Sequence, residues 1–99
     1  MEFEWDEIKN ASNRVKHNIG FELVEHFLWD AAIIEPDNRR DYGEERFVAR
    51  GLATDGLGYH VAFTMRGNML RVITMRRFSR KDYVRYGKGS EAVDGTAQR

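Results

Sequence analysis

Cysteine is absent from this chain of 99 residues, which excludes disulfides, thiolate zinc sites and cysteine nucleophiles. Proline occurs once, as Pro36, and ends whatever element precedes it. Long apolar runs are also missing, because none approaches the length of a membrane span or of a signal-peptide core. We therefore expect a soluble cytoplasmic protein with no membrane partner.

Histidine is scarce, and its spacing does not suit a metal site. His17, His26 and His60 form neither an H-x-H nor an H-E-x-x-H pattern. No two carboxylates have a spacing that favours paired acid–base work. The sequence thus predicts no metal site and no cofactor.

The chain length suits one domain, because about 100 residues bury a single modest core. We expect this domain to span residues 1–86. Residues 87–99, GKGSEAVDGTAQR, have no apolar periodicity, which predicts a flexible C-terminal tail.

The first third of the chain predicts a short strand and two helices. Residues 3–5 form the strand, Asp6 is placed to cap the first helix, and Asn18 can end it in the left-handed conformation. Apolar spacing of three and four predicts the buried face of each helix. These faces are Trp5, Ile8, Ala11 and Val15 in the first helix, and Phe21, Val24, Phe27 and Leu28 in the second.

The remainder predicts strands and one closing helix. After a short strand in AAIIE, β-branched and aromatic residues predict strands over residues 46–53, 59–66 and 69–77, the last two joined as a hairpin by RGN. Ser79 and Asp82 form an S-x-x-D capping box for a helix through about residue 86. This order indicates an α+β fold, with an antiparallel sheet of about four strands packed against two N-terminal helices and one C-terminal helix.

Positive charge is concentrated in one stretch of a neutral protein. The whole chain has sixteen basic and sixteen acidic side chains, yet residues 66 to 88 carry a net charge of +7. This asymmetry favours an anionic partner. The alternative is a solvated face whose charges pair with acids elsewhere in the fold.

Strand alternation divides the basic residues between two faces. His60, Ala62, Thr64 and Arg66 are expected to share one face of their strand. In the next strand Arg71, Ile73, Met75 and Arg77 oppose Leu70, Val72, Thr74 and Arg76. Arg76 and Arg77 therefore point to opposite faces, and only one of them belongs to a given site.

Three blocks of this sequence resemble the BrnT family of type II toxin–antitoxin ribonucleases. FEWDEIKNASNRVKHNIGFE is similar to the family pattern F-x-W-D-x-x-K-x-x-x-N-x-x-K-H-G-[VI]-x-F-E. GEERFVARG resembles the second block, and RVITMRRFSRKDYVRY resembles the third, R-[IV]-I-S-A-R-x-A-x-x-x-E-x-x-x-Y. The departures are Asn18 for glycine, Thr74 and Met75 for Ser-Ala, Phe78 for alanine and Asp82 for glutamate.

The resemblance implies a RelE-like fold and an endoribonuclease that inhibits translation, and the lack of a metal-ligand pattern in the sequence adds the expectation that cleavage is metal-independent. It also implies a BrnA-type antitoxin with a ribbon-helix-helix part, and operator DNA bound only through the antitoxin complex. Arginines on strands can hold the reacting phosphate, so Arg66, Arg71 and Arg76 are the predicted electrostatic catalysts, with Arg77 in place of Arg76 if the strand register differs. We expect RNA binding by Arg77, Arg80, Lys81, Arg85, Arg46 and Tyr86.

Proton transfer is assigned to Lys16 or His17 at the end of the first helix. For His17 the alternative is a cap that complements the helix dipole. His60 is a weaker candidate, because the one feature that favours it is the strand face that it shares with Arg66. Asp82 is expected to cap a helix rather than to catalyse. A second hypothesis for the whole chain is a binding module whose basic face holds nucleic acid or an acidic protein without cleaving it.

Overall fold

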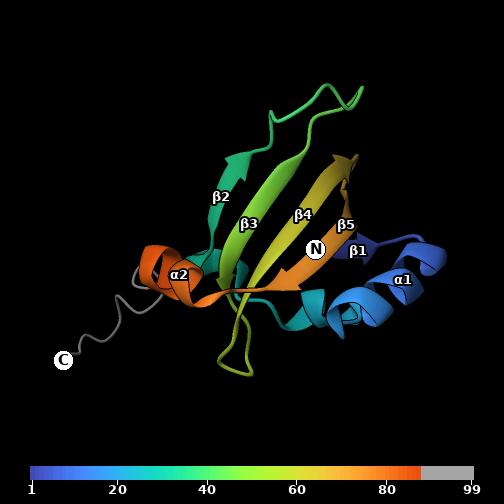
Figure 1. The fold of residues 1–99 in the computed structure, drawn as a ribbon. Helices are drawn as coiled ribbons and strands as arrows, with labels where there is room; N and C mark the ends of the chain where they lie inside the picture. Colours follow the sequence, from blue (N-terminus) through green and yellow to red (C-terminus); the bar gives the residue numbers. More distant parts are fainter. Residues whose placement is uncertain (88–99) are drawn as a thin grey trace.

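A five-stranded sheet in the order β1-β5-β4-β3-β2 organises the chain (Figure 1). The computed structural model describes residues 1–87, so the predicted tail after Gly87 lies outside the described residues. The strands are β1 (Glu2–Glu4), β2 (Ile33–Pro36), β3 (Phe47–Leu52), β4 (Gly58–Arg66) and β5 (Met69–Arg77). The helical segments are α1 (Glu7–His17), η1 (Phe21–His26), η2 (Trp29–Ala31), α2 (Arg80–Asp82) and η3 (Tyr83–Gly87).

The α+β class is confirmed, but the expected sheet of about four antiparallel strands is wrong in detail. The short N-terminal strand β1 joins the sheet as a fifth strand and pairs in parallel with β5. Antiparallel pairing holds for β2 with β3, β3 with β4, and β4 with β5. The predicted β4–β5 hairpin is present, and Gly67 at its turn has a φ of 64°.

The bulge in β5 changes which of its residues share a face. Thr74 pairs with Ala62 but Val72 pairs with Phe63, so Ile73 is an extra residue without a pairing partner in β4. The expected regular alternation along β5 is therefore wrong. Leu70, Val72 and Met75 are all buried, and Arg71 and Arg76 share the opposite face.

The termini of α1 agree with the sequence, whereas its predicted apolar face does not. The Asp6 carboxylate accepts from the amides of Ile8 at 2.8 Å and Lys9 at 3.2 Å, and Asn18 ends the helix with a φ of 58°. The expectation that Ile8 and Val15 are buried is wrong, since they are 81% and 88% exposed. The buried residues of α1 are the asparagines Asn10 and Asn13.

Amide hydrogen bonds explain this inversion. Asn13 contacts the outer edge of β5 beyond the segment that pairs with β1. Its Nδ2 donates to the Met75 carbonyl at 2.9 Å, and its Oδ1 accepts from the Met75 amide at 3.4 Å. Asn10 Oδ1 accepts from the Phe21 amide at 2.8 Å. The helix thus docks through backbone groups that need partners, not through an apolar stripe.

The second helix is a pair of 3₁₀ segments, η1 and η2, in place of the expected α-helix. Phe21, Val24 and Phe27 are buried at a spacing of three, which matches 3₁₀ periodicity and places them on one face. Leu28, predicted to share that face, is exposed. These three side chains pack with residues of β3, β4 and β5 to form the core on one side of the sheet.

The predicted capping box opens the closing segment. Ser79 Oγ accepts from the Asp82 amide at 3.3 Å, and Asp82 Oδ2 accepts from the Ser79 amide at 2.7 Å. After one α-turn, Arg80–Asp82, the chain continues as a π-helix, Tyr83–Gly87. No helix among the described residues is long and apolar enough to cross a membrane.

Candidate active site

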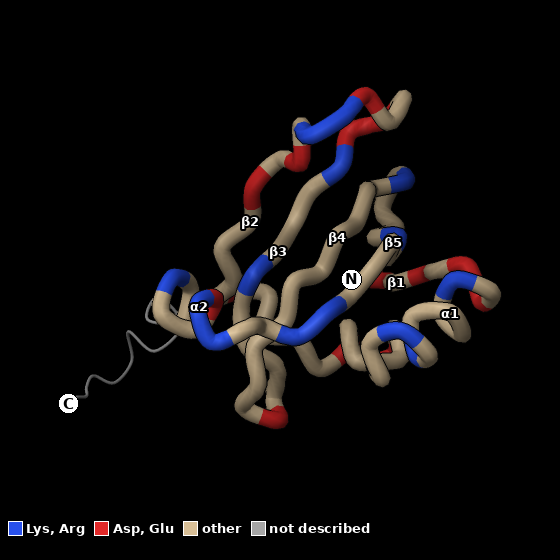
Figure 2. Tube along the Cα trace, viewed as in Figure 1, with Lys and Arg blue, Asp and Glu red and all other residues tan. Residues whose placement is uncertain are grey.

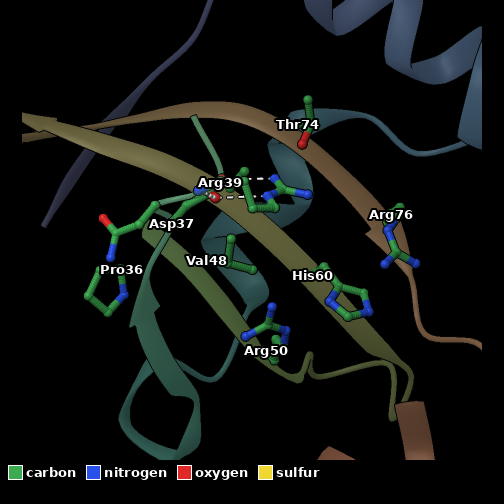
Figure 3. A pocket seen from close by; sticks show the side chains of 10 residues that line it. Pro36, Asp37, Arg39, Val48, Arg50, His60, Thr74 and Arg76 are labelled. Atoms are coloured by element: carbon green, nitrogen blue, oxygen red, sulfur yellow. Dashed lines mark hydrogen bonds and ion pairs between the residues drawn. The ribbon is translucent and has the colours of Figure 1, made fainter. Parts of the chain in front are cut away.

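A cleft of about 200 Å³ lies on the face of the sheet opposite the η1 core (Figure 3). Strands β3, β4 and β5 form its floor, and the segment that follows β2 contributes the wall at Arg39. Its polar side chains are three arginines, a histidine, a threonine, an asparagine and one acid: Arg39, Arg50, Arg76, His60, Thr74, Asn38 and Asp37. This composition suits an anionic ligand.

Arg50, His60 and Arg76 form one row across three neighbouring strands. Arg50 of β3 pairs directly with His60 of β4, and His60 pairs directly with Arg76 of β5. Directly opposite residues hold their Cβ atoms about 4.5–5.5 Å apart on one face of a sheet. The row therefore follows from strand register, and two guanidinium groups flank one imidazole.

Asp82 connects the closing helix to this row. Its Oδ2 lies 2.9 Å from His60 Nε2, while Arg76 Nη1 lies 3.8 Å from the same oxygen. Both side chains of the His60–Asp82 pair are largely buried, at 10% and 18% exposure. The residue expected only to cap α2 also holds the imidazole in place.

The pKa values of this pair favour an ionised acid beside a neutral histidine. Burial tends to raise the pKa of Asp82, but hydrogen bonds from Ser79 and His60 outweigh it and hold that pKa well below its usual range. Burial lowers the pKa of His60, and Arg76 and Arg50 add to this effect, against the opposing influence of Asp82. An ionised carboxylate only accepts, so Nε2 carries the proton and Nδ1 is left basic.

Two aromatic rings lie beside the imidazole. The Phe78 and Tyr86 ring centroids lie 5.0 Å and 6.0 Å from that of His60. The Arg50 guanidinium lies over the Tyr86 ring, 4.9 Å from its centroid. A side chain at Gly58 would overlap the Phe78 ring, so glycine at this position leaves the space that the ring occupies.

The three arginines differ in how fully their donors are used. Arg39 is bound to Asp37 by two hydrogen bonds of 2.8 Å, which keep the pKa of that buried carboxyl far below its usual range. Arg50 Nη1 donates to Glu35 at 2.7 Å, but its buried Nε has no hydrogen-bond partner within residues 1–87. Arg76 is 54% exposed and has the long contact to Asp82, so it is the most available cation of the cleft.

Of the five predicted catalytic residues, the structure places Arg76 in this cleft. Arg66 shares the strand face of His60 but lies six residues further along β4, a separation of about 20 Å. Arg71 is opposite Thr64, toward the same far end, and contacts Glu4 at 3.3 Å. Arg66, Arg71 and Arg76 therefore do not meet at one phosphate.

Lys16 and His17 lie outside the cleft but next to it. They line a groove of about 210 Å³ between α1 and β5, together with Ile73 and Thr74. Thr74 also lines the cleft, so the groove and the cleft adjoin at this residue. A ligand extending from the cleft across Thr74 would reach the end of α1.

The predicted RNA-binding residues are divided between several places. Arg77 pairs with Tyr59 and lines a pocket on the η1 side of the sheet, away from the cleft. Arg46 lies over the Tyr42 ring and contacts Glu44 at 3.3 Å. Tyr86 borders the His60 row, whereas the remaining residues are exposed on α2 and η3: Arg80, Lys81 and Arg85.

Comparison with known proteins identifies the family. The family model for the ribonuclease toxin BrnT of type II toxin–antitoxin systems matches residues 5–82. The chain belongs to the BrnT family. It is similar to the crystal structure of the Brucella abortus ribonuclease toxin BrnT, with a TM-score of 0.66 and 30% identity over 81% of this chain and 99% of that chain. Among curated proteins none matches.

Membership of this family makes the chain a ribonuclease toxin of a type II system, and such a system implies an antitoxin partner. Two departures from the BrnT pattern, Phe78 and Asp82, both contact His60. Sequence reasoning named His60 as a weaker candidate and missed Arg50. The signal that would have found both was the register of β3, β4 and β5.

Proposed function

We propose that this chain is a metal-independent endoribonuclease whose reaction takes place at the Arg50–His60–Arg76 row. The observation that carries the proposal is a buried histidine, held by Asp82 and flanked by two arginines in a cleft. Within residues 1–87 no three His, Asp or Glu side chains gather to hold a metal ion. Proton transfer and charge stabilisation are then supplied by side chains.

The proposed step is an in-line transesterification within RNA. His60 Nδ1 accepts the proton of the ribose 2′-hydroxyl, and the 2′ oxygen forms a bond to the adjacent phosphorus. The bond from phosphorus to the 5′ oxygen breaks, and that oxygen takes a proton from water, while His60 gives its proton to the hydroxide that remains. Arg76 and Arg50 stabilise the charge on the phosphoryl oxygens, and the product ends in a 2′,3′-cyclic phosphate.

In this proposal, the predicted basic residues outside the cleft form the surface along which the RNA lies. Arg71 and Arg66 continue along the same face of the sheet, and Arg80, Lys81 and Arg85 extend the basic surface from the other end. Figure 2 shows Lys and Arg at the end of β5 and on α2. Tyr86 beside the cleft offers a ring on which an unpaired base can stack.

Lys16 and His17 remain an alternative source of the transferred proton. Their groove adjoins the cleft at Thr74, which supports the proposal that they act on the leaving oxygen or bind the next phosphate. Matched substitutions decide between the histidines. Under our assignment His60→Gln should abolish cleavage and His17→Gln should leave it nearly unchanged, whereas the alternative predicts the reverse.

We further propose the biological setting that the family implies. RNA cleavage in the cytoplasm would inhibit translation, and a BrnA-type ribbon-helix-helix antitoxin would neutralise the toxin and carry the complex to operator DNA. The five-stranded sheet, with the η1 and η2 segments packed on one face, supports the proposal that the fold is RelE-like.

A sharp test uses the neighbouring arginines of β5. Arg76 faces the cleft and Arg77 faces the η1 side, so Arg76→Ala and Arg77→Ala remove the same group from opposite faces. We expect Arg76→Ala to lower the rate of RNA cleavage by about 100-fold or more and Arg77→Ala to leave it nearly unchanged. Equal effects of both substitutions, or loss of wild-type cleavage in EDTA, would contradict the proposal.

One observation favours the binding module as a second candidate. Each arginine of the cleft already has a carboxylate partner, namely Asp37, Glu35 or Asp82, and this reduces its pull on a phosphate. Growth arrest on expression in bacteria, relieved by Arg76→Ala with the fold intact, would favour the enzyme. Tight RNA binding without cleavage would favour the module.

A further inference from the structure

Helix α1 presents apolar side chains to solvent along a single line. Ile8, Ala11 and Val15 follow one another at spacings of three and four, and all three are exposed. The opposite side of α1, where Asn10 and Asn13 are buried, is polar. This is the reverse of an ordinary surface helix, whose apolar face points to the core.

The apolar line, here called the α1 ridge and defined as Ile8, Ala11 and Val15, is not a set of scattered exposures. Single exposed apolar residues are normal on proteins and need no explanation. Here two large aliphatic side chains, 81% and 88% exposed, stand seven residues apart on the same line of one helix. Since α1 is anchored through its asparagines, the ridge is not needed to hold the helix in place.

Charges border the ridge unequally. Lys9 and Lys16, also seven residues apart, lie on the side facing β5 and line the groove there, and neither forms an ion pair within residues 1–87. On the other side Arg14 is paired with Glu22 at 2.8 Å. The surface therefore combines an apolar line with one edge of unpaired positive charge.

We propose that the α1 ridge and its lysine edge are the docking surface for the antitoxin, which contributes an amphipathic helix with an apolar stripe and an acidic edge. Helix-on-helix recognition uses anchors at spacings of three, four and seven, as the ridge provides. A second copy of this chain is a poorer fit. Two α1 helices packed antiparallel by a two-fold axis would bring Lys9 of one copy against Lys16 of the other.

The position of the ridge explains how docking would silence the toxin. A stable interface buries more than about 1,000 Å², so the partner must extend beyond the ridge over the neighbouring surface. The adjoining groove leads to Thr74, which is the rim of the cleft. This consequence for activity rests on the proposed ribonuclease function, whereas the docking itself does not.

The test measures binding of the cognate antitoxin to the whole toxin by calorimetry. Ile8→Glu and Val15→Glu place an acid on the ridge, and glutamate is a good helix former, so α1 is retained. We expect each variant to weaken binding by about 10-fold to 100-fold and the double variant to weaken it further. Lys9→Glu should weaken binding as well, with an effect that shrinks at high salt.

Leu57→Glu is the matched control, because it makes the same kind of change at an exposed residue in the β3–β4 turn. It should bind the antitoxin as the wild type does. Wild-type affinity in Ile8→Glu and Val15→Glu would overturn the proposal. It would also be overturned if the free toxin proved to be a dimer that Ile8→Glu separates, because a second copy would then be the occupant.

The two proposals fail independently in this design. All ridge variants should still cleave RNA, since the ridge lies outside the cleft. If the purified toxin cleaves no RNA but Ile8→Glu still loses the antitoxin, the ribonuclease proposal fails and the docking surface stands. If the ridge variants cleave RNA normally and bind the antitoxin as the wild type does, the docking proposal fails and the ribonuclease proposal stands.

Discussion

His60 is where burial, charge and hydrogen bonding meet in this molecule. Its imidazole is flanked by Arg50 and Arg76 in the row and is bound by Asp82. The same carboxylate completes a capping box with Ser79. One acid thus fixes both the first turn of α2 and the orientation of the histidine.

Removing either partner of the His60–Asp82 pair should slow cleavage. We expect His60→Gln to lower the single-turnover rate by about 100-fold to 10,000-fold, the usual contribution of a general base. Asp82→Asn should act in the same direction, because the tautomer is no longer fixed. Residues that act as a unit are not additive, so the double variant should be no worse than His60→Gln alone. Additive losses would show that the two side chains act separately.

The pH dependence of activity should report the lowered pKa of His60. A general base must be neutral, so the rate should rise with pH, and the midpoint of this rise should lie below pH 6.5, the ordinary pKa of histidine. In Asp82→Asn the pKa of His60 should fall further, because the influence that raises it is lost. A rate that continued to climb well above pH 6.5 would point to a different base.

The free energy of unfolding should also depend on pH, in a direction that His60 determines. The unfolded chain binds a proton at His60 more tightly than the folded protein does, so the free energy of unfolding should fall as pH drops below about 6.5. Asp82 and Asp37, whose pKa values are lowered, add a loss of the same sign at more acid pH. Urea unfolding at pH 7.5 and 5.5 should show a smaller difference in His60→Gln than in the wild type.

At this scale the sequence indicated Arg76 and, more weakly, His60, but neither Arg50 nor the bulge that places Arg76 opposite His60. Counting back from the hairpin, where Arg66 pairs with Met69, would place Met75 opposite His60. The extra residue Ile73 shifts the register by one, so Arg76 takes that position. No residue pattern in β5 announces the bulge, which leaves both Val72 and Met75 buried.

At the scale of elements, α1 shows the limit of hydrophobic periodicity. Asp6 and Asn18 fixed its ends correctly, because caps act through local backbone chemistry. The buried face was predicted wrongly, because periodicity assumes that a helix docks by apolar contact. Here two amide side chains bond to the backbone of β5 and of the chain that follows α1.

Asn13→Ala tests this mode of docking. The change leaves the Met75 carbonyl and amide without their side-chain partner, and a buried unsatisfied group costs about 1–3 kcal/mol. We expect the free energy of unfolding in urea to fall by an amount in that range. Ser12→Ala, at an exposed neighbouring position, should change it by less than about 0.5 kcal/mol. Equal stability of the two variants would contradict the docking mode.

Across the whole molecule, the basic stretch of the sequence is not a single patch. Figure 2 shows Lys and Arg along the end of β5 and on α2, with further cations on β3 and α1. Strand geometry assigns Arg76 to the cleft and Arg77 to the other side, while Arg71 lies toward the far end of the sheet. The basic stretch is thus divided between the cleft, the opposite face of the sheet and the far end of β5.

Prediction from sequence was strongest for the class of fold and for the family. The strands β3, β4 and β5, the hairpin and the capping box were predicted within a few residues, because turn residues and caps are local signals. The parallel pairing of β1 and the meeting of His60 with Asp82 join residues far apart in the chain. Such contacts depend on the assembled fold and leave no local signal.

The most direct test of the central claim is the chemistry of the RNA ends. Purified protein is incubated in EDTA with a single-stranded RNA, and the fragments are mapped for position and terminal group. The account predicts cleavage that yields 2′,3′-cyclic phosphate ends, is retained in Arg77→Ala and is lost in Arg76→Ala and His60→Gln. Fragments with 3′-hydroxyl ends, or cleavage that requires an added divalent metal, would contradict it.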